Sequence, residues 1–213
     1  MRDAMAAVLA VTAWSAVLLQ LWLSVGLGLA NGRSVVEGVL VYLGYFTVLT
    51  NIFVALVLTA RLVPSAWTGR RPLSHPQAAA CAACSIALVG LGYHALLREV
   101  WDPQGLQWLA DVMLHYVVPA AYCAFWLLVI PAPALPWWSP LAWSAYPLAY
   151  FAYALARGAV FGTYPYPFID VTAIGYGQAL ANAAGLLSGF VVVGWLFLLL
   201  QRGVRRAGGV PAD

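Results

Sequence analysis

Three polar side chains within apolar stretches of the chain have the types that nucleophilic catalysis needs. Asp111 and His115 are four residues apart, so on a helix both side chains lie on one face. Thr47 carries a hydroxyl in a second apolar stretch, and Asn51 follows it by four residues. A hydroxyl, an imidazole and a carboxylate are the nucleophile, its base and the group that orients the base in one class of hydrolase. Thr47, His115 and Asp111 would take these roles in that order.

The same residues also fit a purely structural role. A helical threonine often hydrogen-bonds its own backbone, and an Asp–His pair can join two membrane helices. A hydrolase also needs a donor for its oxyanion, and Asn51 is the candidate. Thr50, three residues after Thr47, is the alternative nucleophile. Spacing alone therefore leaves catalysis and helix packing both open.

The composition indicates what kind of molecule carries these residues. Of the 213 residues, 64% are hydrophobic and only 8% are charged, whereas soluble domains are about half apolar and about a quarter charged. All ten basic residues are arginines that lie between apolar runs, not in the basic face that a nucleic-acid-binding protein needs. The chain is therefore predicted to be an integral membrane protein that binds no nucleic acid, and a soluble enzyme or a disordered chain is excluded.

Six apolar runs approach or exceed the ~20 residues that a helix needs to cross a bilayer. They cover residues 5–30, 35–60, 77–97, 106–130, 141–157 and 174–201. The run 141–157 is expected to bend at Pro147. Because no long polar segment separates the runs, residues 1–213 are predicted to form a single all-α domain, a polytopic bundle of six transmembrane helices.

The arginines predict how this bundle is oriented, because positive charges favour cytoplasmic loops. One set of alternating loops and ends holds Arg2, Arg61, Arg70, Arg71, Arg202, Arg205 and Arg206. The other set holds only Arg33, Arg98 and Arg157. Both termini are therefore predicted to be cytoplasmic.

This orientation gathers the polar side chains in the outer half of the bilayer. At ~1.5 Å of rise per residue, His115 lies ~12 Å and Thr47 ~18 Å from the outer surface. Thr50 would lie ~4–5 Å deeper than Thr47. The depth estimate therefore favours Thr47 over Thr50 as the partner of His115.

Three segments resemble the androgen-induced membrane protein family, and its bacterial six-helix relatives look closest. They are YFTVLTN at 45–51, DVMLHYVVP at 111–119 and YPYPFID at 164–170. Animal members of that family are multipass hydrolases that cleave fatty acid esters of hydroxy fatty acids with an intramembrane Thr and His. The resemblance implies that the histidine is His115 and that the threonine is Thr47, with Thr50 as the alternative. It also implies a multi-pass protein of a bacterial-type cytoplasmic (inner) membrane.

Two other patterns are interpreted as structural. Cys81 and Cys84 have the C-x-x-C spacing of zinc and redox sites, but only Cys123 remains to complete such a site. No metal and no cofactor is therefore expected. Gly177, Ala181, Gly185 and Gly189 form a ridge of small residues, a pattern that lets helices approach closely. Packing within the chain is the expected use of this ridge, and a homodimer is the alternative.

The sequence therefore predicts an integral membrane hydrolase that cleaves a lipid or fatty-acyl ester with Thr47 and His115. Asp111, Asn51 and Thr50 are the supporting residues, and membrane lipids are the surroundings. The alternative function is a non-catalytic protein that binds a lipid or other hydrophobic ligand, or a small transporter.

Overall fold

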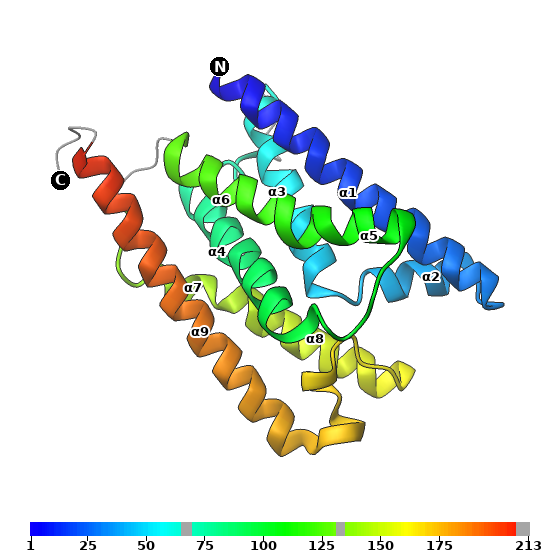
Figure 1. The fold of residues 1–213 in the computed structure, drawn as a ribbon. Helices are drawn as coiled ribbons and strands as arrows, with labels where there is room; N and C mark the ends of the chain where they lie inside the picture. The colour runs from blue at the N-terminus through cyan, green and yellow to red at the C-terminus, as the bar shows by residue number, and fades with distance from the viewer. Residues whose placement is uncertain (65–69, 131–134, 208–213) are drawn as a thin grey trace.

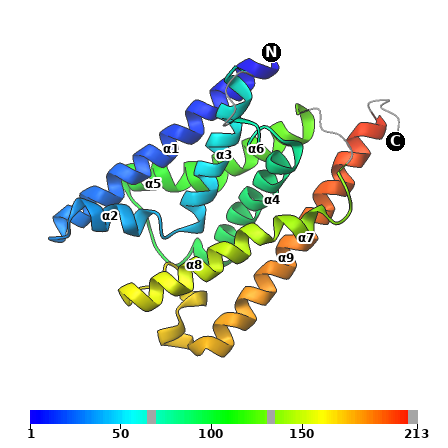
Figure 2. The ribbon, with the colours of Figure 1, turned by 180° about the vertical axis from the view of Figure 1, so that it is seen from behind.

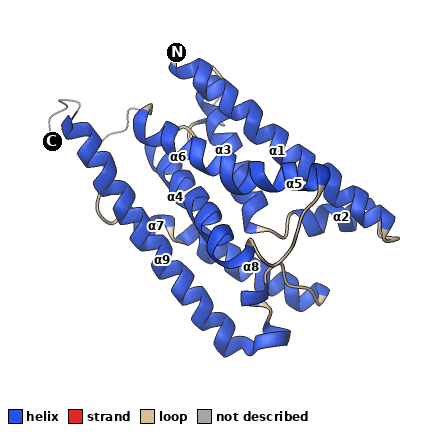
Figure 3. Ribbon diagram, viewed as in Figure 1, coloured by secondary structure: helices blue, strands red, loops and turns tan. Residues whose placement is uncertain are grey.

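The structure, a computed structural model, describes residues 1–64, 70–130 and 135–207, and every regular element in these ranges is a helix (Figure 3). The first half contains α1 (Arg2–Ala30), α2 (Val35–Tyr42), α3 (Phe46–Leu62), α4 (Pro76–Gly92), η2 (Tyr93–Leu97) and α5 (Gly105–Val112). The second half contains η3 (Met113–Val117), α6 (Val118–Leu128), α7 (Ser139–Trp143), α8 (Ala145–Phe161), η4 (Pro167–Ile169) and α9 (Val171–Ala207).

Four continuous helical stretches of the described chain are long and apolar enough to cross a membrane. They are Arg2–Ala30, Pro76–Leu97, Gly105–Leu128 and Val171–Arg206. The pair α2 and α3 counts as a fifth span if its two bent parts are taken together. The prediction of an all-helical protein with several apolar spans is confirmed, and helix length alone supports four or five spans.

The helix predicted over residues 35–60 is broken in its first half. Helices α2 and α3 meet at an angle of 81° across residues 43–45. The break leaves backbone carbonyls without helical partners, and in an apolar environment each needs another donor. The hydroxyl of Tyr150 donates to the carbonyl of Gly44 (2.9 Å), and that of Tyr153 donates to the carbonyl of Leu43 (3.3 Å). Two tyrosines of α8 thus satisfy the backbone at the break.

The helix predicted over residues 141–157 is also interrupted, but not at Pro147. The interruption lies at Ser144, between α7 and α8. Pro147 is the third residue of α8, where its missing N–H has no acceptor within the helix in any case. Helix α8 has 17 residues, fewer than the ~20 that span a bilayer. This is why one of the six predicted spans fails the test of length.

The helices form an elongated bundle whose two ends carry different parts of the chain (Figures 1 and 2). The start of α1 and the end of α9 lie at one end of the bundle, and the α2–α3 break and the α8–α9 connection lie toward the other. Buried apolar side chains from α1 to α9 form one cluster that includes Ala6, Val54, Ile86, Tyr122 and Leu198.

Helix α9 lies at the edge of this bundle and exposes most of its surface. Positions 177, 185 and 189 of its small-residue ridge have no heavy atom within 4 Å of where a Cβ would lie. The expectation that this ridge packs within the chain is therefore wrong for the glycines, because the opposite face, with Phe190 and Leu198, is the buried one. Near its start α9 is kinked at Gly175, whose φ of +75° favours glycine.

Candidate active site

Two π-helical turns lie where the chain supplies the aromatic and ionisable side chains of the site. Such wider turns are often found at functional sites. In η2 the N–H of Arg98 donates to the carbonyl of Tyr93 (2.9 Å), and in η3 the N–H of Val118 reaches the carbonyl of Met113. Pro119 gives a reason for η3, since its ring would crowd the carbonyl of His115 in a regular α-helix.

The two π turns bring Tyr93 and His115 face to face. Their ring centroids are 3.8 Å apart and their planes differ by 15°. Gly90 allows this close approach of α4 and η3, because a Cβ there would lie 3.2 Å from the carbonyl oxygen of His115 and 3.3 Å from Cβ of Pro119. A side chain at Gly90 would push the two helices apart.

Asp111 holds the imidazole of His115 at Nδ1. This nitrogen lies 3.0 Å from the backbone carbonyl oxygen of Asp111 and 3.2 Å from its Oδ1. A carbonyl oxygen can only accept a hydrogen bond, so Nδ1 carries the proton. In the neutral ring Nε2 then has the free lone pair, which is the state that a general base requires.

Tyr93 contacts the other oxygen of the Asp111 carboxylate. Its hydroxyl donates to Oδ2 of Asp111 at 2.6 Å. The side chain of Asp111 is only 5% exposed, so a buried carboxylate here needs such partners. Tyr93, Asp111 and His115 therefore form one connected group built from η2, α5 and η3.

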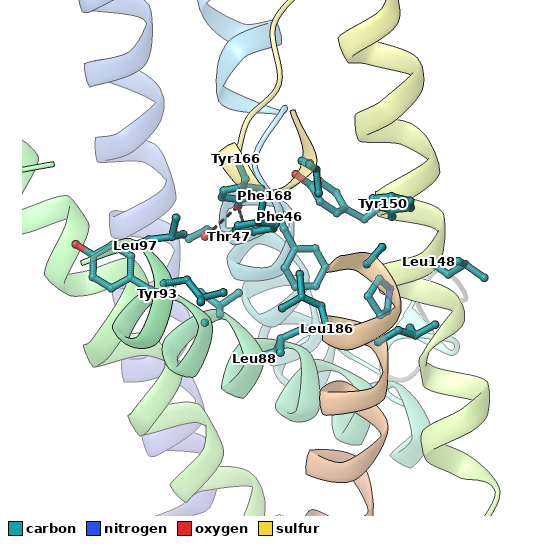
Figure 4. A pocket seen from close by; sticks show the side chains of 18 of the residues that line it. Phe46, Thr47, Leu88, Tyr93, Leu97, Leu148, Tyr150, Tyr166, Phe168 and Leu186 are labelled. Carbon is teal, nitrogen blue, oxygen red and sulfur yellow. Dashed lines mark hydrogen bonds between the residues drawn. The ribbon is translucent and has the colours of Figure 1, made fainter. Parts of the chain in front are cut away.

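Thr47 is the second residue of α3, directly after the break. Its backbone N–H is one of the first N–H groups of the helix, which have no acceptor within it. This N–H donates instead to the hydroxyl oxygen of Tyr166 (3.3 Å), and Oγ1 of Thr47 lies 3.5 Å from the same oxygen (Figure 4). Tyr166 comes from the connection between α8 and η4, so the loop anchors the start of α3.

The other two predicted supporting residues contact the framework around Thr47. Nδ2 of Asn51 donates to the carbonyls of Thr47 (2.8 Å) and Leu114 (3.2 Å), which ties α3 to η3. Both N–H groups of Asn51 are thus occupied. Thr50 is 0% exposed and its hydroxyl lies 3.2 Å from that of Tyr146.

Two cavities meet at Thr47 and Tyr166. The first, of about 530 Å³, is lined by Thr47, Asp111 and His115 together with polar side chains such as Gln107. The second, of about 310 Å³, is almost entirely apolar. It lies between three parts of the bundle, which are the continuous helix of α4 and η2, helix α8 and helix α9 (Figure 4). We call them the polar cavity and the apolar cavity. Thr47 and Tyr166 line both, as do Tyr93 and Leu97, whereas Thr50 and Asn51 line neither.

Comparisons of the chain with protein-family models, with curated proteins and with solved structures found no match. The geometry of the site is therefore what bears on function.

The structure brings three predicted residues to one cavity without joining them all. Thr47, Asp111 and His115 line the polar cavity, and Asp111 contacts His115. No hydrogen bond links the side chains of Thr47 and His115, and the described partner of the Thr47 hydroxyl is Tyr166. Any reaction that uses both residues needs a substrate or a water molecule between them.

Sequence reasoning missed Tyr93 and Tyr166 as members of the site. The chain has eleven tyrosines, and interfacial tyrosines are common in membrane proteins, so neither stands out by type. The one signal for Tyr166 is its place in the YPYPFID segment at 164–170. In the structure Tyr166 is 8% exposed and lines both cavities, so this loop covers them.

The cysteines lie apart from this site. Cys81, Cys84 and Cys123 are free thiols. Across the described residues, no group of three or more His, Cys, Asp or Glu side chains has the arrangement that would hold a metal ion.

Proposed function

We propose that the protein is an integral membrane hydrolase that cleaves a lipid ester, with Thr47 as nucleophile and His115 as base. The observation that carries the proposal is the position of Thr47 in the wall between a polar cavity, which contains His115 and Asp111, and an apolar cavity. An ester with a long acyl chain needs both environments next to the attacking oxygen.

The reaction follows the two-step route of acyl transfer. A water molecule between the two side chains passes the proton of the Thr47 hydroxyl to Nε2 of His115 as Oγ1 bonds to the ester carbon. The tetrahedral intermediate collapses, and the leaving alcohol receives that proton from His115. Water then attacks the acyl-threonine with His115 again as base, which releases the acid and restores Thr47. Throughout, the Asp111 carboxylate stabilises the imidazolium.

The opening of the apolar cavity supports a substrate that enters from lipid. Leu96, Leu148 and Leu180 lie on its rim and are 50%, 55% and 54% exposed. The rim is therefore on the outer surface of the bundle, between η2, α8 and α9. In a bilayer that surface faces acyl chains, so a lipid can slide in sideways.

The resemblance to the androgen-induced family supports the same proposal, because its three motif segments converge in space. Residues 45–51 begin α3, residues 111–119 span α5 to α6, and residues 164–170 form the loop before α9. Members of all three segments line the polar cavity. Fatty acid esters of hydroxy fatty acids are the substrate class that this resemblance implies.

The proposal includes a six-span topology in a bacterial-type inner membrane. Helices α7 and α8 together form the fifth crossing, and both termini are cytoplasmic. The described start of α1 and end of α9 lie at the same end of the bundle (Figure 1), which an even number of crossings requires.

The decisive test compares Thr47→Val with Thr50→Val in protein reconstituted into lipid nanodiscs. Both substitutions remove one hydroxyl and keep the shape of the side chain. We expect Thr47→Val to lower hydrolysis of a long-chain p-nitrophenyl ester by about 10³-fold or more, as loss of a nucleophile does. His115→Ala should do the same, while Thr50→Val stays within about threefold of wild type. Full activity in Thr47→Val would overturn the proposal.

A non-catalytic lipid-binding role is the second candidate. It is favoured by one observation, the hydrogen bond of the Thr47 hydroxyl to Tyr166 in place of His115. A fluorophosphonate probe separates the two functions. Covalent labelling that disappears in His115→Ala supports hydrolysis, and saturable lipid binding without labelling supports the binding role.

A further inference from the structure

Tyr166 is a buried phenol with a fixed position between the two cavities. Its ring stacks on Phe168 with centroids 5.1 Å apart and planes 6° from parallel, and it meets Tyr45 edge-on at 5.7 Å. Only 8% of the residue is exposed. Its hydroxyl is thus held by packing on both sides, which is the preorganisation that catalytic donors need.

The hydrogen bonds of Tyr166 leave its phenolic hydrogen available. The N–H of Thr47 donates to the hydroxyl oxygen, so in this contact Tyr166 is the acceptor (3.3 Å). Oγ1 of Thr47 lies at the long distance of 3.5 Å from the phenol oxygen, and the side chain of Tyr150 is also within hydrogen-bonding range of it. The phenol can therefore donate to an oxygen that arrives next to Oγ1.

Burial keeps this phenol in the form that can donate. Loss of water around the hydroxyl raises the pKa of Tyr166 above its ordinary value. The group stays protonated at neutral pH. A proton that remains on the phenol is what a hydrogen-bond donor to a developing negative charge requires.

We propose that Tyr166 is a catalytic residue of the Thr47 reaction, and that its O–H donates a hydrogen bond to the oxyanion formed at the attacked ester carbonyl. This inference rests on the hydrolase function proposed above. An oxyanion bonded to the same carbon as Oγ1 of Thr47 lies within reach of the phenol, since effective donors are ~2.7–3.1 Å from that oxygen. The backbone N–H groups at the start of α3 add positive potential at the same place.

The charges in this step balance without a proton leaving Tyr166. As Oγ1 bonds to the carbonyl carbon, the π electron pair of the C=O bond moves onto its oxygen, and His115 holds the proton from Thr47. The phenol O–H stabilises the negative oxygen. When the C=O bond forms again, the pair returns and the alkoxide of the leaving alcohol takes the proton from His115. The hydroxyl of Tyr166 is unchanged at the end.

The first experiment compares Tyr166→Phe with Tyr164→Phe, a change of the same size in the same loop at a residue that lines neither cavity. Hydrolysis of a long-chain p-nitrophenyl ester is measured in lipid nanodiscs, with thermal unfolding of each variant as the control for folding. We expect kcat of Tyr166→Phe to fall about 100- to 1000-fold, as for other single oxyanion donors, with KM changed less than about threefold. Tyr164→Phe should keep kcat within about twofold of wild type.

A second experiment separates a chemical role from a structural one. Fluorinated tyrosines introduced at position 166 keep the ring and change the acidity of the phenol. A donor to the oxyanion should give kcat values that follow this acidity in a graded series at constant melting temperature. The series also decides the matter if Tyr166→Phe does not fold.

The outcomes distinguish this inference from the function on which it rests. If Thr47→Val is inactive while Tyr166→Phe keeps kcat within about threefold, or if the fluorotyrosine series is flat, Tyr166 is no catalytic residue and the hydrolase function stands. If the wild type shows no hydrolysis that depends on Thr47, both proposals are overturned.

Discussion

The imidazole of His115, in the wall of the polar cavity, has neighbours that set its plane and its tautomer. The ring of Tyr93 lies parallel to it, and both oxygen types of Asp111 contact Nδ1. The side chain of His115 is 14% exposed, so it remains accessible from the cavity. At the scale of single residues, the site is a histidine that is oriented before any ligand arrives.

We expect Tyr93→Phe to lower kcat about tenfold. The substitution removes the hydrogen bond from the Tyr93 hydroxyl to the Asp111 carboxylate, and this carboxylate orients His115. Hydrogen bonds to charged groups contribute ~1.5–3 kcal/mol, while the stacked ring is kept by phenylalanine. The matched control is Tyr116→Phe, a nearby phenol whose oxygen lies 3.4 Å from Nδ1 of His94. Both are measured as kcat and KM in nanodiscs. An unchanged kcat in Tyr93→Phe would show that Asp111 needs no second partner.

The residues of the site differed in how far the sequence could predict them. Asp111 and His115 are conspicuous because only 8% of the chain is charged, and an ionisable group inside a membrane segment usually has a function. Thr47 came from the combination of depth, spacing and resemblance. Tyr93 and Tyr166 do not stand out among the eleven tyrosines of the chain by residue type or spacing. Each is distinguished only by a hydrogen bond to a residue on another element.

At the scale of elements, the break between α2 and α3 is what makes Thr47 special. An unbroken helix would surround Thr47 with bonded backbone groups, whereas the 81° bend makes it the second residue of a new helix. The sequence could not predict this break, because hydropathy along residues 35–60 depends only on the side chains of that stretch. The break also depends on α8, whose Tyr150 and Tyr153 donate hydrogen bonds to the carbonyls that it leaves free. Hydropathy does not record the π turns either, although Pro119 is a local reason for the one at Met113–Val117.

The contact between α1 and α2 gives a prediction at this scale. A Cβ on Gly38 would lie 2.9 Å from the backbone Cα of Val25, so Gly38→Ala must move α2 away from α1. We expect a loss of about 1–3 kcal/mol of stability, the usual effect of overpacking. Unfolding of the protein in detergent by heat or denaturant measures it.

Gly26→Ala is the matched control for that change. Position 26 lies in α1, and no heavy atom is within 4 Å of the place that a Cβ would take there. Alanine at this position should therefore leave stability equal or raise it by ~0.5–1 kcal/mol. Equal stability of both variants would contradict the tight packing of α2 on α1.

For the whole molecule, the class of protein was easier to predict than the number of its spans. A bilayer demands a surplus of apolar residues, and 64% hydrophobic residues supply it. The span count depends on whether short helices such as α8 cross as part of a pair. The small-residue ridge of α9 illustrates the same difficulty, because a periodic pattern does not say which side of a helix meets the bundle.

Reporter fusions test the topology directly. With six crossings, reporters at the N-terminus and the C-terminus both report the cytoplasm, and a reporter inserted after Arg98 or at Gly162 reports the outside. With five crossings, because α7 and α8 do not cross, the two ends lie on opposite sides. The described start of α1 and the described end of α9 lie at the same end of the bundle (Figure 2), so we expect the first result.

If Thr47 cleaves a lipid ester as proposed, the wall shared by the polar and apolar cavities gives the reaction a direction. The fatty acyl fragment would be released next to the rim of Leu96, Leu148 and Leu180, from which it could diffuse into the lipid. The fragment that carries the new hydroxyl would be left on the side of Gln107 and His115. Neither product has to pass the other on its way out, so a fresh ester can enter by one route while a product still leaves by the other.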